Sequence, residues 1–119
     1  MDFDESRPIY VQLVEDFKIK ISNGEWLPGD KTDSVRNLAS TYQVNPNTVQ
    51  RALAELERDG LCESKRTAGR FVTGDKKLVE KLSGKAFNKF ADDFISGMKS
   101  LNIDKEEAIK NLDEYWEEL

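Results

Sequence analysis

The chain has 119 residues and a formal net charge of −5. Its single cysteine, Cys62, and its lack of histidine exclude an internal disulfide and a metal site built from Cys and His clusters. The commonest general base is therefore missing, and no Ser/His/Asp arrangement or phosphate-cradling glycine loop is present, so we expect neither an enzyme nor a cofactor. No segment approaches the roughly 20 apolar residues that cross a bilayer, and the acidic N-terminus lacks the apolar core of a signal peptide, so we expect a cytoplasmic protein with no membrane partner.

Two helices are predicted in the first third of the chain. Between residues 9 and 22, apolar side chains recur on one helical face, and Asn23-Gly24 supplies a stop. A turn containing proline and glycine follows. Asp33 and Ser34 are both good N-caps for a second, short helix that ends at Tyr42.

A third helix is predicted directly after a tight turn. Asn45 is a good N-cap, Pro46 suits the first helical position, and Gly60 ends the helix. At about 100° per residue, four apolar side chains gather on one side. These side chains must face the core, and they are Val49, Ala52, Leu53 and Leu56.

The opposite face of the third helix carries side chains that suit DNA. Asn47, Gln50 and Arg51 lie in its first half, and these residue types hydrogen-bond base edges or phosphates in a groove. A recognition helix presents its N-terminal residues to the bases, and Ala54 adds no bulk behind them. A merely solvated helix face is the alternative that this helix alone leaves open.

Two short strands are predicted over residues 61–65 and 70–73. The turn between them contains Gly69, which can adopt a positive φ. We interpret Cys62, beside Leu61, as a small buried apolar side chain rather than a redox centre. Two short helices joined by a tight turn and followed by a hairpin have the order of a winged helix-turn-helix.

Positive charge gathers near the hairpin although the whole chain is acidic. The window from Lys31 to Arg70 has a net charge of +2, which leaves −7 for the remainder. Lys65, Arg66 and Arg70 repel one another at the hairpin tip; an anionic partner relieves that repulsion, and a flexible solvated loop is the alternative. Arg36 lies in the first turn of the second helix, where a cation opposes the helix dipole. A phosphate contact and an intramolecular salt bridge explain that position equally well.

Two amphipathic helices are predicted beyond a polar linker. Apolar residues recur from Leu78 to Leu101 at spacings of three to five, interrupted by Gly84, which costs about 1 kcal/mol relative to Ala. Asp104 with Glu107 resembles a capping box for the last helix. The expected fold is therefore mainly α with a small β-hairpin.

The chain divides in this interpretation into a winged helix-turn-helix domain over residues 1–75 and a helical hairpin over residues 76–119. The apolar stripe of the hairpin is large for two helices, and aromatic residues and Met are enriched in interfaces. Packing on its own DNA-binding domain is one alternative to a dimer, and lining a pocket for a small-molecule effector is another use of the same side chains. The expected homodimer interface consists of Phe87, Phe90, Phe94, Met98, Leu101, Tyr115 and Trp116.

Several motifs of the first 73 residues together resemble the GntR family of bacterial regulators. The motifs are Pro8-Ile9-Tyr10 with Gln12-Leu13, Gly24 with Leu27-Pro28-Gly29-Asp30-Lys31, Ser34-Val35-Arg36-Asn37-Leu38-Ala39, Val44-Asn45-Pro46-Asn47-Thr48-Val49, Leu56-Glu57-Arg58-Asp59-Gly60-Leu61, and Gly69-Arg70-Phe71-Val72. The short C-terminal part resembles the two-helix appendage of the YtrA-type subfamily. Thr32-Asp33 stands where the family often has Leu-Pro, and Pro46 and Gln50 stand where some relatives carry arginine. The resemblance therefore predicts no operator sequence for this chain.

The resemblance implies that the second helix holds phosphate or a base, that the third helix enters the major groove, and that the wing reaches the minor groove or its phosphates. The expected DNA-binding residues are Arg36, Asn45, Asn47, Thr48, Gln50, Arg51, Lys65, Arg66, Thr67, Gly69 and Arg70. Family habit further implies a homodimer on a palindromic operator, repression, control of a transporter operon, and release or tightening by a small effector. A winged helix used only for protein contacts is the second function class, and an enzyme is the third.

Overall fold

The computed structural model describes all residues from 1 to 119 and contains two compact units, Met1–Gly84 and Lys85–Leu119. The sequence-based division at residue 75 lies earlier in the chain. The first turns of the following helix belong to the first unit because Leu78, Val79 and Leu82 pack against its core. None of the helices has the length and hydropathy that crossing a bilayer requires.

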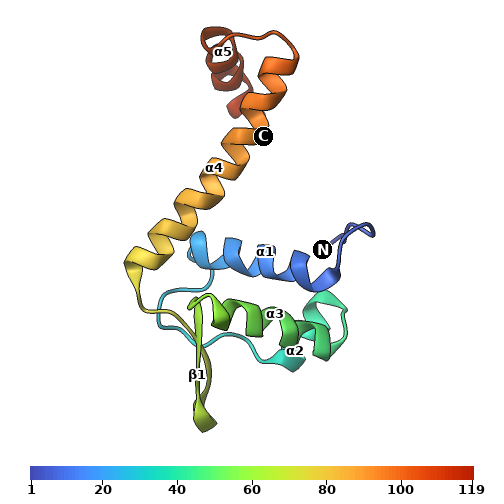
Figure 1. Ribbon diagram of the computed structural model, residues 1–119, viewed down its shortest axis with the longest axis vertical. Helices are drawn as coiled ribbons and strands as arrows, with labels where there is room; N and C mark the ends of the chain where they lie inside the picture. Colours follow the sequence, from blue (N-terminus) through green and yellow to red (C-terminus); the bar gives the residue numbers. More distant parts are fainter. The chain divides into compact units, whose positions relative to one another are not determined.

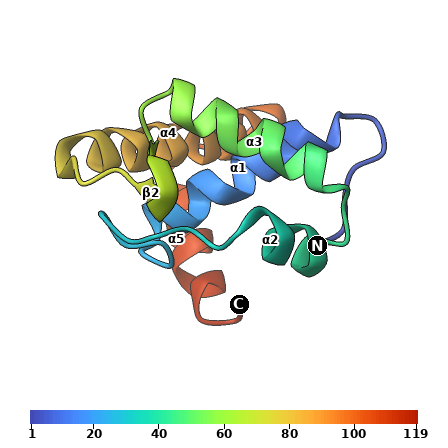
Figure 2. The ribbon, with the colours of Figure 1, turned by 90° about the horizontal axis from the view of Figure 1, so that it is seen from below.

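The first unit contains three helices, a two-stranded antiparallel sheet and the beginning of a fourth helix (Figure 1). Its elements are α1 (Ile9–Ser22), α2 (Val35–Tyr42), α3 (Pro46–Arg58), β1 (Cys62–Lys65), the short 3-10 helix η1 (Arg66–Ala68), β2 (Gly69–Val72) and the first turns of α4 (Lys76–Ser100). Within this unit α3 packs on both α1 and α2, as the view in Figure 2 also shows. The predicted fold class, a winged helix-turn-helix with a small hairpin, is confirmed.

Local side-chain chemistry sets the bounds of α2 and α3. The Ser34 side chain accepts a hydrogen bond from the Asn37 N–H at 3.1 Å, so Ser34 rather than Asp33 caps α2. Gln43 has a left-handed φ of 56° and turns the chain toward α3. The Asn45 side chain accepts from the Asn47 N–H at 2.7 Å, which confirms the predicted cap. These side-chain hydrogen bonds fix the residues at which α2 and α3 begin.

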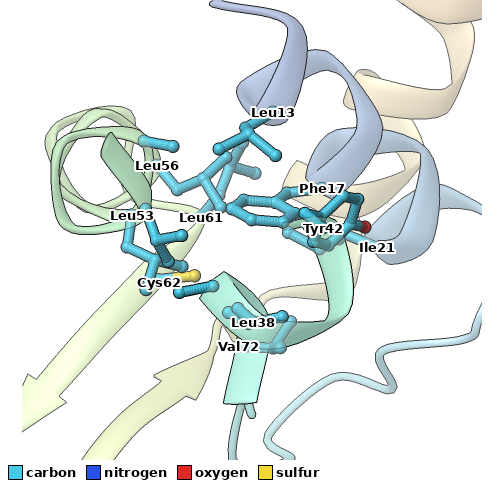
Figure 3. Close-up of a cluster of buried hydrophobic side chains, with 13 residues drawn as sticks. Leu13, Phe17, Ile21, Leu38, Tyr42, Leu53, Leu56, Leu61, Cys62 and Val72 are labelled. Carbon is cyan, nitrogen blue, oxygen red and sulfur yellow. The ribbon is translucent and has the colours of Figure 1, made fainter. Parts of the chain in front are cut away.

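One apolar core joins the three helices to the hairpin (Figure 3). Leu13 and Phe17 of α1 and Leu56 of α3 are fully buried, and Leu38 of α2 is 2% exposed. Cys62 is 3% exposed within the same cluster, as predicted, and burial raises the pKa of its thiol to about 11. The core therefore holds α3 with its polar side turned outward.

The hairpin has a third partner that the sequence did not indicate. β1 and β2 pair antiparallel, with Cys62 opposite Val72. Residues 29–32 run along the other edge of β2: Lys31 forms a bridge with Phe71, and the Thr32 N–H donates to the Arg70 carbonyl at 2.9 Å. Residues 29–32, the strap between α1 and α2, therefore fix the base of the wing formed by β1 and β2.

The second unit contains the rest of α4 and α5 (Lys105–Trp116). α4 runs unbroken through Gly84, so the expected interruption is absent. Asn102 adopts a left-handed φ of 57° at the turn, and the Asp104 side chain accepts from the Glu107 N–H at 2.9 Å, which confirms the predicted start of the last helix.

Candidate nucleic-acid interface

The outer face of α3 is built as the helical spacing requires. Its four inward side chains are at most 1% exposed, and they are Val49, Ala52, Leu53 and Leu56. Asn47, Gln50 and Arg51 are exposed on the opposite side, while Thr48 is half-buried. The structure therefore brings three hydrogen-bonding side chains together on a surface that no other part of the first unit covers.

Arg51 has an aromatic neighbour that sequence reasoning missed. Its guanidinium carbon lies 3.7 Å from the centroid of the Tyr10 ring. Tyr10 belongs to the first turn of α1, which packs on α3. Stacking on an aromatic face restricts the guanidinium plane while its N–H groups stay available as donors.

Only the oxygen of the Asn45 side-chain amide forms a hydrogen bond within the protein. The oxygen accepts the capping bond at α3, and the amide NH₂ group makes no hydrogen bond in the structure. Asn45 is exposed beside Asn47. Its free donors are thus available to an acceptor outside the chain.

The cations of the wing are of two kinds, unpaired and ion-paired. Lys65 and Arg66 are exposed and form no ion pair, although the Lys65 ammonium lies 4.8 Å from the centroid of the Phe71 ring. Arg70 is half-buried, and its Nε lies 3.4 Å from a carboxylate oxygen of Glu57 on α3. The sequence predicted three unpaired cations at this tip. Instead, Arg70 forms an ion pair with Glu57 and thereby connects the wing to α3.

Glu57 of α3 contacts two residues of the wing, Arg70 and Ser64. It accepts a short hydrogen bond from the Ser64 hydroxyl, and this bond together with the charge of Arg70 holds the pKa of Glu57 below its ordinary value. The carboxylate is therefore charged at neutral pH and neutralises Arg70 locally. Thr67 is exposed between the strands, and Gly69 has a φ of 108°.

Arg36 forms no ion pair or side-chain hydrogen bond and is exposed in the first turn of α2. Of the two explanations that its position allowed, the intramolecular salt bridge is absent. The orientation of α2 is set elsewhere, since the Tyr42 hydroxyl donates a short hydrogen bond to Asp16 of α1. Arg36 thus carries an unpaired charge on the surface of the first unit.

The expected interface residues of the second unit are largely open to solvent in the single chain. Phe87, Phe90, Leu101 and Trp116 are between 62% and 71% exposed. Tyr115 is 51% exposed and Phe94 is 38% exposed, while Met98 is half-buried. A cavity of about 360 Å³ between the end of α4 and α5 is lined mainly by apolar side chains.

No group of His, Cys, Asp and Glu side chains is arranged to hold a metal ion. A capped helix with an exposed polar face, packed beside a short wing that carries unpaired cations, defines the class of winged helix-turn-helix DNA-binding proteins. Residues 9–72 match the family of bacterial regulatory proteins known as the gntR family, and the chain belongs to that family.

Its relatives are regulators. The chain is 36% identical to the uncharacterised HTH-type transcriptional regulator YhcF of Bacillus subtilis, over 97% of this chain and 95% of that protein. It is 43% identical to the transcriptional repressor YtrA of the same organism, over 67% of this chain and 63% of that one. A solved GntR family transcriptional regulator from Listeria monocytogenes is 40% identical, with a TM-score of 0.87 over 94% of this chain and 98% of that chain. The chain is therefore a DNA-binding transcription regulator and not an enzyme.

Proposed function

We propose that two copies of the chain bind a palindromic operator and repress transcription from the promoter that contains it. The observation that carries this proposal is the exposed α3 face of Asn47, Gln50 and Arg51, flanked by unpaired cations. The relative YtrA is a transcriptional repressor, which supports the sign of regulation. A bound dimer represses by blocking polymerase at the promoter.

The side chains divide into base readers and phosphate holders. Asn and Gln suit adenine, and Arg suits guanine, so Asn47, Gln50 and Arg51 read base edges in the major groove. The remaining contacts go to the DNA backbone and fix the register of α3 on the duplex. The residues that make these contacts are Arg36, Asn45, Thr48, Lys65, Arg66, Thr67 and Gly69. Arg70 acts through Glu57 by holding the wing against α3.

A homodimer through the second unit gives the exposed aromatics a partner. Monomers rarely leave so many large apolar side chains in solvent, and such patches mark association sites. The charges also suit a second copy: Lys81, Lys85 and Lys89 follow one another at four-residue spacing on α4, while α5 carries acidic residues at helical spacing. A two-fold dimer puts two recognition helices about 34 Å apart, one turn of DNA.

We extend the proposal to effector control and to the regulated genes by resemblance to the family. The apolar cavity between α4 and α5 is the candidate binding site for a small effector, because the proposed dimer residues Phe94 and Met98 line it. A ligand there would change the dimer and hence the spacing of the recognition helices. A transporter operon is the proposed target, and the bacterial cytoplasm, where the DNA is, is the proposed location.

Footprinting on the DNA upstream of the chain's own gene tests the proposal. We expect protection of two symmetric half-sites about one helical turn apart. Protection that spreads evenly over unrelated DNA, or none at any concentration, contradicts a sequence-specific regulator. A screen of metabolites for thermal stabilisation tests the effector, and no stabilising compound counts against it.

The alternative of a winged helix that contacts only proteins is tested by salt. Binding to DNA releases counterions, so the logarithm of the association constant falls with the logarithm of salt by about 0.9 for each phosphate contact. A protein partner has no need of the polar α3 face or of the unpaired wing cations. A steep negative slope therefore supports DNA as the partner.

A further inference from the structure

Lys31 lies in an unusual position at the base of the wing. It follows the turn after α1 and forms the bridge with Phe71 that attaches residues 29–32 to β2. Its side chain crosses the α-carbon of Gly69: a β-carbon at residue 69 would lie 2.7 Å from the Lys31 Cε and 3.4 Å from its Nζ. Carbon atoms in contact normally stay 3.5–4.0 Å apart. Only glycine at residue 69 leaves this path for the lysine open.

The lysine ends at a hollow that the wing and the beginning of α2 enclose. This hollow has a volume of about 340 Å³, and Val35 and Leu53 contribute apolar lining. Three cations border it, Lys31, Arg66 and Arg70, against one carboxylate, Asp33. Only Arg70 among these cations has an ion-pair partner, so the hollow carries uncompensated positive charge.

Hydrogen-bond donors reach the same hollow from the helix. The Ser34 hydroxyl caps α2 and lines the hollow, and the positive end of the α2 dipole points the same way. Ser64 of β1 also lines the hollow, but its hydroxyl donates to Glu57. Two unpaired cations beside the Ser34 hydroxyl suit an oxyanion such as a phosphate better than a neutral ligand.

We propose that this hollow is a phosphoryl-binding subsite, that Lys31 is its principal cation, and that a DNA backbone phosphate occupies it. The inference rests on the proposed function and extends it to residues of the strap between α1 and α2. Gly69 acts as a positioning residue, since its lack of a side chain lets the lysine stem cross β2. The wing and α2 then hold the same phosphodiester from two sides.

The test compares the salt dependence of two lysine variants on a duplex selected from a random library by the wild-type protein. Lys31→Met keeps the unbranched stem and removes the charge. We expect it to weaken binding to all duplexes alike and to lower the slope of log K against log salt by about 0.9. Lys110→Met, an equal charge change on exposed α5, is the matched control and leaves the slope unchanged.

Gly69→Ala tests the path of the lysine. The new methyl group displaces the Lys31 ammonium, so the slope falls as in Lys31→Met, and the double variant loses no further slope. Residue 69 has a φ of 108°, a conformation that alanine adopts poorly, so thermal melts establish that the variant is folded before binding is measured. Lys31→Met carries the test alone if Gly69→Ala does not fold.

Titration of the free protein with inorganic phosphate, against sodium chloride at equal ionic strength, separates the two sources of a phosphoryl group. Amide NMR shifts at Ser34 and Gly69 that saturate with phosphate and vanish in Lys31→Met report the subsite without DNA. If the DNA slope is unchanged but these shifts appear, free phosphate is the ligand. The proposal is overturned if wild-type binding depends steeply on salt, Lys31→Met has the same slope, and phosphate causes no saturable shift. Failure of the wild type to bind any duplex refutes the proposed function instead.

Discussion

The guanidinium of Arg51 on α3 stacks 3.7 Å from the ring centroid of Tyr10 on α1. A side chain that reads a guanine must present two N–H groups in one plane. The Tyr10 ring restricts that plane before DNA arrives, so less conformational freedom is lost on binding. The first turn of α1 thereby contributes to recognition without a base contact of its own.

Tyr10→Leu therefore reduces base discrimination, whereas Tyr10→Phe preserves it. An exposed cation–π contact contributes about 0.5–1 kcal/mol, so the preference at the base pair read by Arg51 falls about two- to fivefold. Arg51→Ala removes about 1–3 kcal/mol of the same preference. The measurement is the dissociation constant for the selected duplex and for single-base variants. A Tyr10→Leu protein that weakens every duplex equally would show that the ring only supports the fold.

Asn45 separates stability from recognition. Asn45→Ser retains a side-chain oxygen for the Asn47 N–H, so the free energy of unfolding stays within about 0.5 kcal/mol of the wild type. Asn45→Ala loses the cap and about 1 kcal/mol. If the free amide group donates to a phosphate, both variants also bind DNA about tenfold more weakly, because a hydrogen bond to a charged group contributes about 1.5 kcal/mol or more. Denaturant unfolding and binding assays on the same samples measure the two effects, and wild-type affinity in Asn45→Ser would leave Asn45 as a cap alone.

Phe90 tests the proposed dimer. It is 62% exposed on α4, and a carboxylate in the centre of an apolar interface is strongly unfavourable. We expect Phe90→Glu to sediment as a monomer at micromolar concentration and to protect half of the operator weakly. Asn88→Glu adds the same charge at an exposed neighbouring position and keeps the dimer. A wild-type protein that sediments as a monomer contradicts the proposal without any variant.

Local chemistry made most of the first unit predictable. The caps at Ser34 and Asn45 are short-range hydrogen bonds, and each is visible as a residue type next to an apolar pattern, as is the cap at Asp104 in the second unit. The outer face of α3 followed from helical spacing alone, since the core must cover the other side. Gly84 did not break α4, because one glycine costs about 1 kcal/mol while the apolar contacts of Leu78 and Leu82 hold the first turns to the core.

Long-range contacts decided what the sequence left open. Nothing near Lys31 in the chain indicates that it pairs with Phe71, because an isolated bridge has no periodic pattern. The pairing of Arg70 with Glu57 is likewise set by how the wing folds back on α3. Both contacts change the candidate site: one adds a cation that the pattern did not single out, and the other removes a charge that it counted as free.

Cys62 reports the integrity of the core that supports α3. Its thiol is 3% exposed, and burial raises its pKa from 9.0 to about 11. At pH 8 we expect almost no reaction with a thiol-specific reagent in buffer and rapid reaction in urea, and Cys62→Ser abolishes the signal. Since the folded-state pKa is the higher one, the neutral thiol stabilises the fold fully below pH 9, and this stabilisation is lost as the pH rises toward 11. The difference between the wild type and Cys62→Ser in denaturant unfolding between pH 8 and 11 measures that loss, because Tyr42, whose pKa is also raised, titrates in both proteins. Fast labelling of the native protein at pH 8 would mean that the hairpin opens readily and that the wing is not held against α3.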